Sequence, residues 1–111
     1  MKLPTKLQVD NLLEHYHNFR YSDAEKLALS MNEEFPEFPI SWKVLGAIFM
    51  RTCRMPQALD VHQKVVKLVP QDFEAHYDLG LALQELGRFQ ESELSLRTAV
   101  QLNPDFIEGY Y

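Results

Sequence analysis

The chain has a single cysteine, four glycines and no long apolar run. Because Cys53 has no second cysteine to pair with, an intramolecular disulfide is excluded, and nothing indicates an oxidising compartment. No apolar stretch reaches the roughly 18 residues needed to cross a bilayer. The four glycines form neither a phosphate-cradling loop nor a Gly-x-Ser-x-Gly elbow. We therefore predict a soluble, cytoplasmic chain with no membrane partner.

Positive charge is also scarce, with 11 Lys and Arg against 16 Asp and Glu and a net charge of −5. A duplex nucleic-acid partner is therefore not expected, because its binding needs many phosphate-facing cations. His15 and His17 are two apart and cannot share one helix face, and His62 and His76 have no ligand pair beside them. Cys53 lacks the surroundings of a nucleophile. We predict no metal, no cofactor and no catalysis.

What the chain does have is a period of 34 residues. Pro36, Pro70 and Pro104 stand at equal intervals, and two further columns keep the same step. Those columns are Ala24, Ala58 and Ser92, and Arg20, Arg54 and Arg88. Such a period is typical of stacked repeats, which bury their apolar faces against one another and leave a long concave surface. The default function of such an array is to hold another molecule.

Each repeat contains two helical segments with apolar residues at helical spacing. Thr5 with Gln8 predicts a capping box at the first helix, Ser22 with Glu25 predicts one at the second, and Asp72 is expected to cap the fifth. Short loops make each pair antiparallel, so the fold is an all-α stack. The expected helices cover residues 6–18, about 22–35, 40–52, 56–68, 73–86 and 89–102.

The charges of the three repeats alternate in sign. Residues 1–38, 39–72 and 73–111 carry net charges of −3, +3 and −5. One interpretation is that opposite signs attract adjacent repeats across exposed surface, where each pair is worth little. The other is a binding groove of alternating sign.

Trp42-Lys43-Val44-Leu45-Gly46 and His76-Tyr77-Asp78-Leu79-Gly80, with the small columns and the repeated prolines, resemble the tetratricopeptide-repeat family. The first repeat matches least, with Asn11-Leu12 in place of Leu-Gly. The resemblance implies a short right-handed α-solenoid in a single domain, 1–111. Its repeats would be 5–38, 39–72 and 73–106, with 107–111 the start of a truncated fourth.

The resemblance also implies a noncatalytic interaction module, an adaptor or scaffold, whose first helices line a groove for a peptide or protein. The groove residues that it implies are Lys6, Val9, Asp10, Leu13, Tyr16, His17, Ile40, Lys43, Val44, Ala47, Met50, Arg51, Glu74, Tyr77, Asp78, Leu81, Gln84 and Glu85.

Two groove chemistries of this family are not matched. The places of the Lys and Asn that clamp a terminal carboxylate hold other residues, and no asparagine ladder precedes the Leu-Gly positions. An alternative stays open, in which Lys43 and Arg51 pair with Asp78 and Glu85 and leave no vacant site. The residues at the clamp positions are Val9, Leu13, Val44, Glu74 and Asp78.

The last helix pair has no repeat to cover it, and an uncovered apolar face favours self-association. The end could pair with a second copy, be covered by the chain's own tail, or belong to a longer protein. Residues 12–59 resemble the N-terminal repeats of longer bacterial proteins, in which such arrays present substrates to a glycosyltransferase or sulfotransferase domain. That role and a self-assembling scaffold are the alternative functions. The expected edge residues are Phe89, Leu96, Val100, Phe106 and Ile107.

Overall fold

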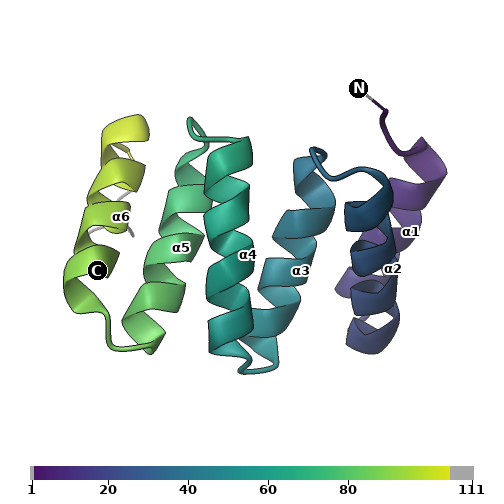
Figure 1. The fold of residues 1–111 in the computed structure, drawn as a ribbon, viewed down its shortest axis with the longest axis horizontal. Coiled ribbons are helices and arrows are strands. Elements are labelled where there is room, and N and C mark those ends of the chain that lie inside the picture. Colours follow the sequence, from purple (N-terminus) through teal and green to yellow (C-terminus); the bar gives the residue numbers. More distant parts are fainter. Residues whose placement is uncertain (1, 106–111) are drawn as a thin grey trace.

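The computed structural model describes residues 2–105, which form six α-helices in a row (Figure 1). Consecutive helices are antiparallel, and no strand occurs in this part of the chain, so the predicted all-α stack of helix pairs is confirmed. The start of a fourth repeat, 107–111, lies outside the described residues. The helices are α1 (Lys6–His17), α2 (Tyr21–Glu34), α3 (Pro39–Arg51), α4 (Met55–Leu68), α5 (Phe73–Glu85) and α6 (Phe89–Leu102).

Two of the three predicted N-caps are confirmed. Thr5 accepts a hydrogen bond from the Gln8 backbone N–H, and the Gln8 side chain accepts one from the Thr5 backbone N–H. The Asp72 carboxylate accepts one from the Glu74 N–H at 3.0 Å. The capping box at Ser22 is wrong, because α2 already begins at Tyr21 and Ser22 lies within its first turn.

The turn inside each helix pair has a left-handed residue at one repeated position. Phe19, Cys53 and Gly87 have φ angles of 61°, 59° and 76°. In the second pair, the N–H of Arg54 donates to the carbonyl of Phe49 at 2.7 Å, a bond that the other two pairs repeat. This is the Schellman arrangement that closes helix ends, and it lets the next helix start two residues later.

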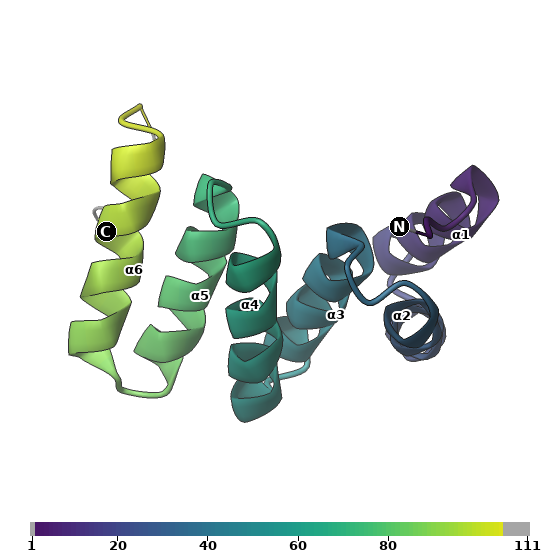
Figure 2. The ribbon, with the colours of Figure 1, turned by 45° about the horizontal axis from the view of Figure 1, so that its top comes forward.

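The three pairs stack in chain order. The second helix of one pair packs against the first helix of the next, so that α2 meets α3 and α4 meets α5. Figure 2 shows that the pair α1–α2 is turned relative to α3 and α4, which gives the row its twist. A continuous core cluster therefore runs from α1 to the start of α5, and it includes Leu12, Met31, Ile48, Val65 and Ala75.

Small residues set the distance between paired helices. Ala24 and Ala58 are fully buried, and Ser92 at the same position donates from Oγ to the Gly80 carbonyl at 2.7 Å. A Cβ atom added to Gly46 would lie 2.6 Å from Cε1 of His62. The absence of a side chain at Gly46 is therefore what allows α3 to lie this close to the ring on α4.

A ring-to-carbonyl hydrogen bond joins both the second and the third repeat to the proline that precedes it. Trp42 Nε1 donates to the Pro36 carbonyl at 3.0 Å, and His76 Nε2 donates to the Pro70 carbonyl at 2.8 Å. A carbonyl only accepts, so the proton of His76 lies on Nε2. His76 thus replaces the tryptophan expected at this position and keeps its hydrogen bond.

Three buried polar side chains lack partners among the described residues. The Ser41 hydroxyl, both polar atoms of the Asn32 amide and Nε2 of His62 make no hydrogen bond there. His62 is 3% exposed, and burial lowers its pKa to about 4 from the ordinary 6.5. The ring is therefore neutral in the folded chain at neutral pH.

We predict that Gly46→Ala destabilises the chain by about 1–3 kcal/mol, because the new methyl group overpacks the contact with His62. The penalty should shrink in a His62→Ala background, where the opposing ring is gone. Urea unfolding of the four chains measures this coupling. An equal penalty in both backgrounds would contradict the contact.

We predict that His62→Leu weakens the acid sensitivity of the fold. The folded-state pKa lies below the unfolded one, so this residue's contribution is complete above pH 6.5 and is lost as the pH falls toward 4. Relative to the variant, the native chain should lose about 2 kcal/mol of unfolding free energy between pH 7 and pH 5. Parallel unfolding curves at the two pH values would show that His62 does not titrate in this way.

Candidate partner-binding face

The predicted groove residues lie on α1, α3 and α5, and many of them are half-buried. A half-buried apolar side chain packs on the core and still offers surface to another molecule. Three such side chains lie on α1 and two on each of α3 and α5. They occupy equivalent positions of the 34-residue repeat, and we call them the apolar row. The row consists of Val9, Leu13, Tyr16, Ala47, Met50, Tyr77 and Leu81.

The remaining groove candidates divide into three groups. Val44 differs from the expectation, because its side chain is 7% exposed and belongs to the core. Lys43 and Asp78 are half-buried beside the apolar row. The others are exposed and border the face, namely Lys6, Asp10, His17, Ile40, Arg51, Glu74, Gln84 and Glu85.

Arg51 connects the first two repeats across this face. Its Nε donates to the Tyr16 hydroxyl oxygen at 2.9 Å, and its guanidinium lies 5.8 Å from the centre of that ring. Outside the face, Arg54 forms a two-point ion pair with Glu25, with contacts of 2.6 and 3.1 Å. Opposite charges of the first and second repeats therefore do meet, at this second contact between the two.

Lys43 forms an ion pair with Asp72, the residue that caps α5. Burial opposes ionisation of Asp72, but the Lys43 ammonium and the N–H groups of Glu74 and Ala75 outweigh it and lower the pKa of this carboxyl. The alternative pairing of Lys43 with Asp78, and of Arg51 with Glu85, does not occur within residues 2–105. The prediction missed Asp72 because it had assigned this residue only to capping.

Asp78 therefore keeps a half-buried carboxyl with no hydrogen bond or ion pair to any described residue. Burial is the main reason that its pKa rises to about 6, with Glu74 adding repulsion and Lys43 giving partial compensation. A carboxylate in this position is under-compensated near neutral pH. It is suited to accept hydrogen bonds from N–H groups or to attract a cation.

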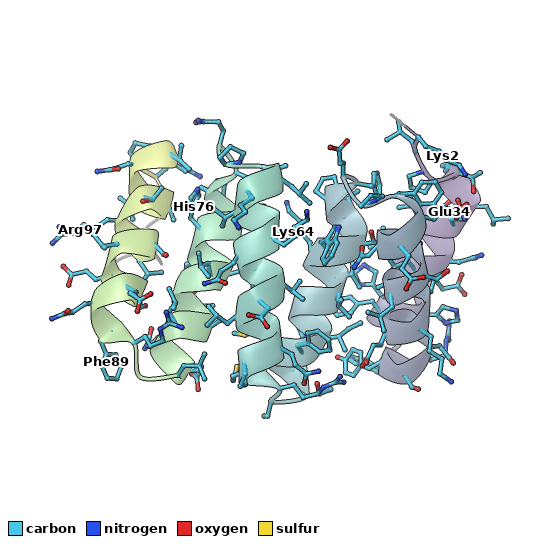
Figure 3. The ribbon with its side chains drawn as sticks, viewed as in Figure 1. Lys2, Glu34, Lys64, His76, Phe89 and Arg97 are labelled. Carbon is cyan, nitrogen blue, oxygen red and sulfur yellow. The ribbon has the colours of Figure 1, made fainter. Side chains whose placement is uncertain are left out.

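The described residues of the predicted self-association edge lie on α6, where Leu96 packs against Gly80 of α5. A cavity of about 680 Å³ opens there, and Phe89, Leu96 and Val100 line it. Gln84, which we had assigned to the groove, also lines this cavity. Figure 3 shows Phe89 and Arg97 on this side of the molecule. Phe106 and Ile107 lie outside the described residues.

No group of three or more His, Cys, Asp or Glu side chains in residues 2–105 is arranged to hold a metal ion. Among the described helices, none has the length and apolar character needed to span a membrane.

Comparisons with known proteins agree on the type of repeat. Residues 73–106 match the family model of the tetratricopeptide repeat. The peroxisomal targeting signal receptor of Candida albicans is 30% identical over 87 residues, which are 78% of this chain and 14% of the receptor. The chain thus spans a small part of that relative.

Two solved structures share the fold at low identity. The first TPR of Spaghetti, bound to the HSP90 peptide SRMEEVD, has a TM-score of 0.88 at 15% identity, over 94% of this chain and 82% of that one. The Yersinia enterocolitica type III secretion chaperone SycD, in complex with a peptide of the translocator YopD, has a TM-score of 0.85 at 16% identity. That match covers 93% of this chain and 79% of the chaperone chain.

We predict that Asp78→Asn stabilises the folded chain at pH 7. The folded-state pKa lies above the unfolded one, so ionisation of Asp78 costs stability as the pH rises from about 4 to about 6. The variant should exceed the native chain by about 1–2 kcal/mol at pH 7 and lose this advantage at pH 4.

Chemical denaturation at the two pH values tests this expectation, with Glu85→Gln on the same helix as the control for removal of an exposed carboxylate. A less stable Asp78→Asn chain at pH 7 would mean that the carboxylate is favourably compensated.

Proposed function

We propose that this chain, which belongs to the tetratricopeptide-repeat family, is a protein-interaction module that holds a peptide segment of a partner along α1, α3 and α5. We assign it no chemistry of its own. The observation that carries the proposal is the row of half-buried apolar and aromatic side chains repeated on the three helices. Its members include Leu13, Ala47 and Leu81, which are spaced so that successive side chains of one peptide could each meet a different helix.

The two peptide complexes among the solved structures support a peptide as the ligand, although their low identity supports the fold alone. The apolar row favours side-chain contacts with the peptide. The neighbouring Arg51–Tyr16 hydrogen bond holds α1 and α3 together and so keeps two sides of the face in a fixed relation. A preorganised face loses less conformational entropy on binding.

The charges of the face favour a basic or neutral peptide over an acidic one. Lys43 is already paired with Asp72 and compensates Asp78 only in part, and Glu74 and Glu85 lie exposed on the same helix as Asp78. A peptide with Lys or Arg near α5 would supply the missing countercharge. The HSP90 peptide in the Spaghetti complex has the acidic end EEVD, so we expect this chain to prefer ligands of a different charge.

Panning of phage-displayed random peptides on the native chain tests the proposal, followed by titration of the enriched sequences as synthetic peptides. We predict that Ala47→Arg weakens their binding at least about tenfold, because the long cation occupies the centre of the face and repels basic peptides. Ala47 is half-buried on α3, so the new side chain can extend toward solvent and leave the core intact.

Leu29→Arg is the matched control, since Leu29 is 47% exposed on α2 and receives the same new side chain away from the face. Enriched peptides that bind both variants equally well would contradict the location. A selection that enriches only acidic peptides would contradict the charge preference.

A further inference from the structure

The cavity beside α6, which Gln84 of α5 also lines, has the lining of an internal helix contact. Ser92, Leu96 and Val100 form one side of the helix there, while Phe89 is 67% exposed at the start of α6. An exposed aromatic ring beside an apolar hollow favours a packed partner. This surface lies at the last described helix, and it meets the face formed by α1, α3 and α5 at Gln84.

The repeat register indicates what kind of element fits this cavity. The position 34 residues before Glu93 is Leu59, which is 7% exposed in the second repeat, where α5 packs against α4. The α6 surface therefore corresponds to a surface that is covered by a helix one repeat earlier. Another helix is the element that this geometry accommodates.

The charges on the rim suit a second copy of the same helix. Glu93 and Arg97 lie one turn apart with exposed side chains and pair with each other at 2.6 Å. Two antiparallel α6 helices related by a two-fold axis at Ser95 would bring Glu93 of each copy opposite Arg97 of the other. The same axis places Phe89 of each copy beside Gln101 of the other, so the surface is complementary to itself.

We infer that the chain forms a two-fold symmetric dimer through α6, in which each cavity receives the α6 helix of the second copy. Phe89, Leu96 and Val100 supply the apolar contact, and Glu93 and Arg97 set the antiparallel register. Exposed ion pairs contribute little affinity but disfavour a mismatched arrangement strongly.

Sedimentation velocity of the full chain between about 10 μM and about 1 mM tests the inference, since weak dimers dissociate in this range. We expect a reversible monomer–dimer equilibrium. Glu93→Lys and Arg97→Glu should each raise the dimer dissociation constant at least about tenfold, because like charges then meet twice across the axis. The double variant Glu93→Lys/Arg97→Glu should restore the native value within about threefold.

The control is Asp10→Lys. It removes the comparable ion pair between Asp10 and Lys6, which lie four residues apart on α1 at the opposite end of the stack. It should leave the dissociation constant unchanged. Circular dichroism of each variant separates loss of the dimer from loss of the fold.

A native chain that is monomeric over the whole range would overturn the inference and leave the cavity to residues 106–111 or to another protein. A dimer that tolerates both single charge reversals would place the contact elsewhere. A double variant as weak as the single ones would rule out the proposed antiparallel register.

Discussion

The close approach of paired helices at columns of small residues is the contact on which the rest of the structure depends. Ala24 and Ala58 lie fully buried where two helices meet, and Gly46 leaves room for a whole imidazole ring. Paired helices at this spacing bury their apolar stripes. The left-handed residue in each turn lets the second helix of the pair begin two residues later. Once one pair has this geometry, repetition of the same columns generates the stack.

The periodicity of the sequence predicts most of this architecture, because propensity, capping and packing favour the same helices. All six helices were predicted within one or two residues of their bounds. The conformations of Phe19 and Cys53 were harder to predict, since neither residue type favours positive φ. The signal was nevertheless present, because both residues align with Gly87 at a spacing of 34 residues. Ser22 misled the prediction because its local capping pattern indicated a later helix start. The left-handed turn at Phe19 instead lets α2 begin at Tyr21.

The candidate face was harder to predict than the fold. Register alone identifies which helix side a residue occupies, but it does not show how deeply the side chain is buried or which partner a charge chooses. Val44 thus lies in the core, and Lys43 pairs with Asp72 at the start of α5 and not with Asp78 inside it. These choices depend on how far each side chain reaches and on which groups lie near it, and register does not give either. Asp78 keeps an under-compensated carboxyl because Lys43 pairs with Asp72.

The unpartnered polar groups between α2 and α3 make the two junctions of the stack unequal. Asn32 and Ser41 occupy positions that Val66 and Ala75 occupy one repeat later, and a buried amide without hydrogen bonds costs free energy that an aliphatic side chain does not. In a one-dimensional array each junction carries its own cooperativity. The two ends of the array should therefore differ in how readily they open. We expect the first repeat to open before the other two, so that backbone amides of α1 and α2 exchange with solvent faster than those of α4 and α5.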